Sequence, residues 1–247
     1  MNKMDNFGLT EASGIAHDLY ILTPDLYDRW HDSLDKSKQN WLNAQNFKAK
    51  SGAAICLPDY DGHIDLAFGI VDAPYIWDGA KLSSALPKAV WDMRVYDSCI
   101  DRDQLGRLAL GWGLANYRFD RFRDKAKTPL NQLVCPQNVP VSWLNGLLTG
   151  TYLCRDLINL PSNHLTPAEL ETAARQLAKT HQAAITTYEG DQLADAFPAI
   201  HTVGRAAETG PRLIDLRWGT SGPKITLIGK GITFDSGGLD LKPSKAM

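Results

Sequence analysis

Three charged side chains lie in a glycine-rich segment near the end of the sequence: Lys230, Asp235 and Lys242. Glycine occupies positions 231, 237 and 238 between them. The segment follows the apolar run 225–228, which predicts a short buried strand. Ligands of open α/β sheets bind beyond the carboxyl ends of the strands, and glycines permit turns tight enough to aim all three side chains at one point. The pattern favours a binding or catalytic site.

An ordinary surface turn is the alternative interpretation of the same residues. The sequence Asp-Ser-Gly-Gly at 235–238 is common in turns, and a lysine at the end of a strand is usually solvated. The order G-x-x-x-x-G-K-[ST] is absent, which excludes a phosphate-binding loop of that kind. Spacing alone leaves both interpretations open.

The sequence around Lys230, Asp235 and Lys242 resembles the first metal-binding segment of the leucyl (cytosol) aminopeptidase family, whose members are two-metal exopeptidases. The resemblance rests on the ungapped run GKGITFDSGG at 229–238 and on LKPS at 241–244. It implies that Lys230 is an amine ligand of a metal ion, that Asp235 bridges both ions, and that Lys242 contacts the substrate carbonyl oxygen. It also implies two divalent ions, Zn or Mn, with bicarbonate as a further cofactor of the complete enzyme.

The chemistry of these side chains agrees with the implied roles. A lysine binds metal only through its neutral amine, and two nearby dications favour that neutral form. Arginine stays protonated and could not take this role. The carboxylate of Asp235 has two oxygens, one for each ion. A protonated Lys242 could stabilise the oxyanion that forms when hydroxide attacks a peptide carbonyl.

The elements that would position this segment alternate between helix and strand. The pattern predicts helices over 142–158, from Pro167 through Ala178, and over 191–197, with strands over 183–188, 213–218 and 225–228. This alternation favours an α/β domain with a largely parallel sheet. Together with the resemblance, it predicts the start of a mixed-sheet α/β catalytic domain over residues 140–247.

The first part of the chain predicts a smaller α/β domain over residues 1–139. Strands are expected over 14–22, 53–57, 64–71, 90–96 and 133–136, with a hairpin turn at 59–62. Helices are expected from Pro24 to about Asn46 and over 102–118. We place the boundary between the two domains near residue 139.

A second stretch also resembles the aminopeptidase family. Residues 155–167 carry the order R-D-L-x-N-x-P-x-N-x-L-T-P found at the entry to its catalytic domain. Thr166 and Glu169 form a capping-box signal with Pro167 at the first helical position. Residues 203–207 depart from the family because many members are more glycine-rich there, which leaves the shape of that loop open.

Composition and charge exclude several classes of protein. Hydrophobic residues make up 44% and charged residues 22% of the sequence, as in globular proteins, and the net charge of −2 gives no electrostatic case for nucleic acid or an anionic membrane. No signal-peptide core or membrane-spanning apolar run is present. The four cysteines form no C-x-x-C pair, which predicts buried free thiols in the cytoplasm.

The stretch 117–127 mixes basic and aromatic residues, a pattern that can track a nucleic-acid backbone. Asp120 and Asp124 dilute its charge, so a solvated helix end that leads into a loop is the favoured interpretation.

The resemblance also implies ligands that follow Lys242 in the family and are not among these 247 residues. Since each metal site needs about four ligands, we expect the chain to be an incomplete copy that is inactive alone. The principal hypothesis is a peptide-cleaving aminopeptidase, in the family a hexamer. The alternative is a non-catalytic binding or assembly module built on residues 1–139.

Overall fold

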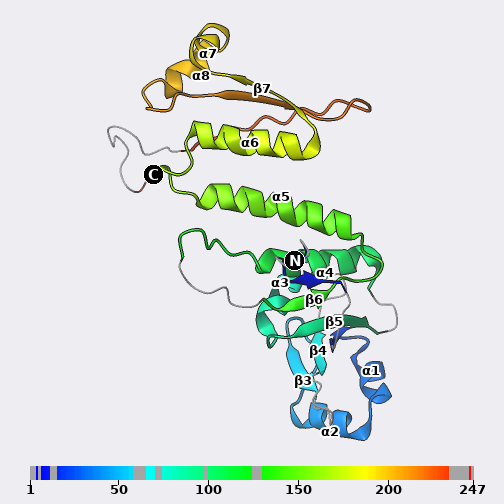
Figure 1. Ribbon diagram of the computed structural model, residues 1–247. Coiled ribbons are helices and arrows are strands. Elements are labelled where there is room, and N and C mark those ends of the chain that lie inside the picture. Colours follow the sequence, from blue (N-terminus) through cyan, green and yellow to red (C-terminus); the bar gives the residue numbers. More distant parts are fainter. Residues whose placement is uncertain are drawn as a thin grey trace. The chain divides into compact units, whose positions relative to one another are not determined.

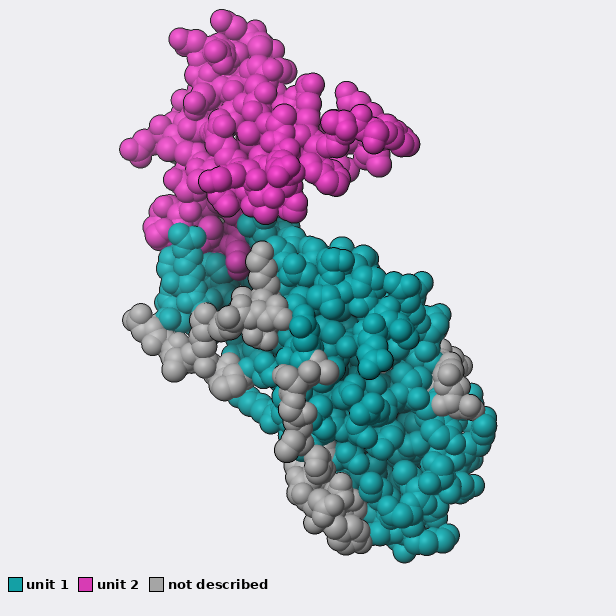
Figure 2. All heavy atoms as spheres, turned by 45° about the vertical axis from the view of Figure 1, so that its right-hand side comes forward, with its two compact units in different colours: residues 1–154 teal, residues 155–247 magenta. Residues whose placement is uncertain are grey.

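The computed structural model describes residues 4, 7–11, 16–57, 65–69, 74–96, 100–123, 130–233 and 245 (Figure 1). The chain divides into two compact units, residues 1–154 and 155–247, which are coloured separately in Figure 2. The division falls within helix α5 (Val141–Asn159), and the boundary expected near residue 139 lies just before that helix begins.

A six-stranded sheet forms the centre of unit 1. In spatial order its strands are β1 (Leu9–Thr10), β6 (Gln132–Val134), β5 (Val90–Val95), β2 (His17–Leu22), β4 (Asp65–Gly69) and β3 (Ala54–Leu57). Neighbouring strands run parallel except β3, which pairs antiparallel with β4. This pairing agrees with the predicted hairpin, whose turn at 59–62 lies outside the described residues. The expected smaller α/β domain is therefore confirmed as a mixed sheet with helices.

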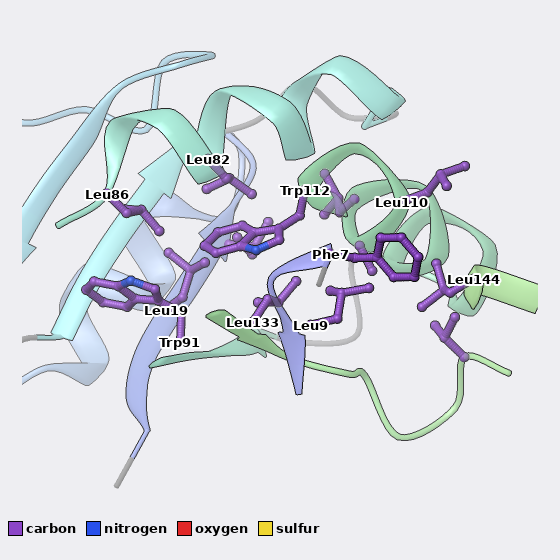
Figure 3. Close-up of a cluster of buried hydrophobic side chains, with 14 of the residues drawn as sticks. Phe7, Leu9, Leu19, Leu82, Leu86, Trp91, Leu110, Trp112, Leu133 and Leu144 are labelled. Atoms are coloured by element: carbon purple, nitrogen blue, oxygen red, sulfur yellow. The ribbon is translucent and has the colours of Figure 1, made fainter. Parts of the chain in front are cut away.

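Alternate side chains of β2 enter two different cores. Leu19 and Ile21 belong to the larger core, with residues of α3 (Ile76–Ala85), α4 (Arg102–Ala115) and α5 (Figure 3). Leu22 belongs to a second core, with residues of α1 (Tyr27–Ser33) and α2 (Lys36–Ala44). Since successive side chains of a strand point to opposite faces, helices cover the sheet on both sides.

Two helical features of unit 1 differ from the sequence prediction. The helix expected from Pro24 to Asn46 is divided, because Leu34 is extended and the Asp35 side chain accepts hydrogen bonds from the first backbone amides of α2. Helix α3 was not predicted, since Gly79 and two serines weaken its helical pattern. It packs closely on α4: a Cβ atom at Gly111 would lie 1.7 Å from the Ile76 carbonyl oxygen, so only glycine fits there.

Unit 2 contains one long helix and a two-stranded sheet. Its described elements after α5 are α6 (Pro167–His181), β7 (Ala184–Tyr188), α7 (Gly190–Ala196), α8 (Pro198–Gly204) and β8 (Leu213–Arg217). Strands β7 and β8 pair antiparallel, so the expectation of a largely parallel sheet is wrong for the described part of this unit. Alternation of helix and strand gives the order of the elements, and it leaves strand direction open because a long connection fits either direction.

The described cysteines are free thiols, as expected, but the predicted burial is wrong for two of them. Cys56 and Cys154 are exposed, while Cys135 is half-buried. Burial, with a smaller contribution from Glu11, raises the pKa of the Cys135 thiol to about 11. No helix in the described ranges has the length and apolar character needed to span a membrane.

Candidate metal-binding segment

The stretch that leads to Lys230 has no regular secondary structure. Ile225, Leu227 and Ile228 are 82%, 92% and 94% exposed, so the predicted buried strand at 225–228 is wrong. A strand persists only when its backbone groups pair with a neighbour. Within the described part of unit 2, β8 pairs with β7 and no strand pairs with this stretch.

The backbone turns directly after Lys230 and contacts α6. The Ile232 amide donates a hydrogen bond to the Lys230 carbonyl oxygen at 3.0 Å. A Cβ atom at Gly231 would lie 2.8 Å from Cδ2 of Leu170, on the first turn of α6. Lys230 itself is exposed. Both contacts lie within unit 2, and the second places the backbone next to the expected amine ligand beside the start of α6.

The other two expected site residues, Asp235 and Lys242, lie outside the described residues. Of the three charged side chains singled out in the sequence, the structure therefore places Lys230 alone. Across the described ranges, no group of three or more His, Cys, Asp or Glu side chains could hold a metal ion.

The connection between α5 and α6 is a short turn that brings the chain to the helix cap. The amides of His164 and Leu165 donate to the Pro161 carbonyl oxygen at 2.8 Å and 3.1 Å. The predicted capping box is present: the Thr166 hydroxyl accepts from the Ala168 amide, and the Glu169 carboxylate accepts from the Thr166 amide at 2.9 Å. Helix α6, which carries the contact with Gly231, thus has a well-defined start.

Ion pairs connect α6 to the elements around it. The two carboxylate oxygens of Glu171 lie 2.6 Å from Arg212 Nε and 2.6 Å from Arg175 Nη2. Arg212, just before β8, also pairs with Glu189 at 3.0 Å, and Arg175 donates to the Thr187 hydroxyl of β7 at 3.1 Å. The Glu171 carboxylate therefore links α6 to the residue before β8, and Arg175 extends the network to β7.

These partners favour the ionised form of Glu171. Its partial burial opposes ionisation, but the hydrogen bond from Arg175, the nearby Thr187 hydroxyl and the positive charge of Arg212 outweigh that effect and lower the pKa of the carboxyl group. The sequence contains a signal for only part of this network. Glu171 and Arg175 have the i,i+4 spacing of a helical ion pair, whereas Arg212 is distant in the chain.

The mixed basic and aromatic stretch after α4 is irregular in its described part. The rings of Phe119 and Phe122 meet edge-on with centroids 5.8 Å apart, and the Arg121 guanidinium lies 5.9 Å from the Phe122 centroid. The third ring of the stretch, Tyr117, packs edge-on against Tyr152 of α5 with centroids 5.0 Å apart. The aromatic rings are thus engaged in contacts within the protein, which favours the interpretation as a helix end that leads into a loop.

Both parts of the chain match domain models of one protein family. Residues 18–136 match the model described as "M17 aminopeptidase, N-terminal domain". Residues 152–247 match the model described as "Cytosol aminopeptidase family, catalytic domain". The two matches follow each other in the chain without overlap, and the second includes the whole glycine-rich segment 229–244.

Individual relatives agree with these matches. A probable cytosol aminopeptidase of Aeropyrum pernix is 36% identical over 83% of this chain and 43% of its own length. The crystal structure of a cytosol aminopeptidase from Coxiella burnetii superposes with a TM-score of 0.86 at 35% identity, over 96% of this chain and 52% of that one. The bottromycin maturation enzyme BotP, solved in complex with Mn, gives a TM-score of 0.72 at 26% identity, over 94% and 51%. The chain spans about half the length of these relatives.

Proposed function

Since the chain belongs to the M17 family of cytosol aminopeptidases, we propose that the protein removes amino-terminal residues from peptides by metal-dependent hydrolysis. The observation that carries the proposal is the pair of consecutive family matches, of which the catalytic-domain match includes the segment GKGITFDSGG. The substrates proposed are peptides with a free amino terminus, with leucyl peptides as the first class to test.

We assign Lys230 and Asp235 to the metal ions and Lys242 to the substrate. A neutral amine and a carboxylate are donors that suit Zn²⁺ and Mn²⁺, and BotP, a similar protein, binds Mn. Such ions, when bound, polarise a carbonyl group and supply hydroxide at neutral pH. Lys242, kept protonated, would donate to the oxygen that gains negative charge during hydrolysis.

The native metal, bicarbonate, cytoplasmic location and homohexameric assembly are part of the same proposal. The relatives' name, cytosol aminopeptidase, supports the location, and free thiols agree with a reducing compartment. Family resemblance alone supports the hexamer and bicarbonate. The native gene product is the protein as its own gene encodes it, purified whole. Light scattering measures its mass in solution, and the mass of a single protomer would contradict the hexamer.

The proposed reaction is tested with two substrates that differ only at the amino terminus. The native gene product should release the chromophore from leucyl p-nitroanilide, and a chelator should abolish that release until Zn²⁺ or Mn²⁺ is added back. N-acetyl-leucyl p-nitroanilide is the control and should not be cleaved. Absence of any turnover with either metal would favour the non-catalytic binding module.

A further inference from the structure

We propose that Leu170 is a positioning residue for Lys230: its side chain packs against the backbone of Gly231 and sets the direction in which the Lys230 amine leaves the chain. The proposal rests on the function proposed above, since it takes Lys230 as a metal ligand. It adds a residue on a different element, 60 positions earlier in the sequence, whose type carries no chemical signal.

The contact begins at Gly231 and not before it. The apolar side chains at 225, 227 and 228 are almost fully exposed, and a Cβ atom at Gly229 would meet nothing within 4 Å. At Gly231 the same atom would lie 2.8 Å from Leu170 Cδ2, well inside the optimum of about 3.5–4.0 Å for two carbon atoms. Glycine therefore lets the backbone approach the leucine as closely as it does.

The geometry at Gly231 acts on Lys230 through the peptide bond that they share. Because the peptide unit between Lys230 and Gly231 is planar, a backbone held at Gly231 also places the Cα atom of Lys230, which lies in the same plane. The hydrogen bond from the Ile232 amide to the Lys230 carbonyl oxygen fixes the same peptide from the other side. Together these contacts restrict the direction of the Lys230 Cα–Cβ bond, and with it the region that the flexible side chain can reach.

The half-buried Leu170 can serve as a support because the helical backbone that carries it is held on both sides. The Leu170 amide donates to the carbonyl oxygen of the cap residue Thr166 at 3.1 Å. The next residue, Glu171, pairs with Arg212 and Arg175 at 2.6 Å each. The first turn of α6 is thus held by the cap at its start and by ion pairs directly after Leu170.

Limited proteolysis of the 247-residue chain tests the contact, with an internal control. Trypsin cleaves after both Lys224 and Lys230, but only Lys230 borders the contact with Leu170. Leu170→Ala should increase cleavage after Lys230 several-fold relative to cleavage after Lys224, because local opening exposes that bond. Global unfolding would raise both rates together. Leu177→Ala, the same truncation at a half-exposed position of α6, should leave the ratio unchanged.

Calorimetric titration of the native gene product with Mn²⁺ alone tests the consequence for metal binding. Leu170→Ala should weaken Mn²⁺ affinity by roughly tenfold, as loss of a residue that supports a metal ligand does, while Leu177→Ala should not. Gly231→Ala should also weaken binding, and the double variant with Leu170→Ala should recover part of the loss, because the added methyl group then has room. Gly229→Ala is the matched control.

The outcomes separate the inference from the function on which it rests. An unchanged cleavage ratio in Leu170→Ala, or unchanged Mn²⁺ affinity beside tight binding by the wild type, would overturn the role of Leu170. Failure of the wild-type protein to bind Mn²⁺ or Zn²⁺ at all would instead overturn the proposed function, and the positioning role with it. The proposal is supported if Leu170→Ala raises the ratio of cleavage after Lys230 to cleavage after Lys224 and weakens Mn²⁺ affinity, and if the double variant recovers part of the affinity that Gly231→Ala loses.

Discussion

Lys230 and Lys242 belong to one glycine-rich segment, yet their proposed roles need different charge states, neutral for Lys230 and positive for Lys242. A metal ligand must be a neutral amine, whereas a group that stabilises an oxyanion acts as a cation. Replacement of each lysine should therefore change a different measured quantity. Loss of Lys230 should reduce the amount of bound metal, and loss of Lys242 should reduce turnover.

Lys242→Ala tests this division directly. The variant should retain the metal content of the wild type and lose a factor of about 10²–10³ in kcat, as when one oxyanion donor is removed. Lys245→Ala, a lysine three residues further on, is the control and should behave like the wild type. Metal content is measured by elemental analysis and kcat with leucyl p-nitroanilide. Loss of metal from Lys242→Ala would contradict the assigned role.

At the scale of single elements, the sequence predicted those whose signal is local. The cap of α6 follows from Thr166, Pro167 and Glu169 alone, and the structure contains it. The run 225–228 is apolar enough for a strand, but strand formation also needs a neighbour to pair with, which a local pattern does not contain. Helix α3 was missed for a related reason. Its glycine allows close packing on α4, and a local pattern does not contain that neighbour either.

The Glu171 network predicts a pH dependence of stability in unit 2. Its folded-state pKa is lowered, so its stabilising effect is present above the unfolded pKa, about 4.3 for Glu, and is lost as the pH falls through the folded value. Glu171→Gln should therefore lower the melting temperature at pH 7. At pH 3 the difference between variant and wild type should shrink. Thermal unfolding followed by circular dichroism measures both values.

The matched control for this measurement is Glu208→Gln, at an exposed glutamate of the same unit. Its melting temperature should follow that of the wild type at both values of pH. If Glu171→Gln were as stable as Glu208→Gln at pH 7, the ion pairs with Arg175 and Arg212 would contribute nothing measurable, as many exposed pairs do.

At the scale of the whole chain, the boundary near residue 139 and the division at 154 make different predictions about stability. Leu144 and Leu148 of α5 are fully buried in the larger core of unit 1, and the Tyr152 hydroxyl donates to the Gly113 carbonyl oxygen at 2.7 Å. A fragment of residues 1–139 lacks all three. It should be less stable than a fragment of residues 1–159 by several kcal/mol, since each lost leucine costs about 2–5 kcal/mol.

Chemical denaturation followed by tryptophan fluorescence compares the two fragments. Equal midpoints and slopes would show that α5 does not stabilise unit 1, and the boundary near residue 139 would then describe the folding unit correctly. Leu147→Ala in the longer fragment is a suitable control, because Leu147 lies on the exposed side of the same helix.

The sequence predicted the motif residues of the candidate site but not the residues that pack around them. The runs GKGITFDSGG and LKPS carry a family resemblance, which names Lys230, Asp235 and Lys242 without any structure. The contact between Gly231 and Leu170 could not be predicted, because it joins residues far apart in the chain through packing that leaves no pattern in either segment. For the same reason, the partner Arg212 of Glu171 was found only in the structure.

The most direct measurement of the central claim is the metal content of the native gene product with Asp235→Asn beside Asp240→Asn. Both substitutions remove one carboxylate from the same segment, and only Asp235 is a proposed ligand. We predict that Asp235→Asn loses bound metal and leucyl p-nitroanilide turnover together, while Asp240→Asn keeps both. Full metal content and turnover in Asp235→Asn would contradict the claim that this segment is the metal-binding centre of an aminopeptidase.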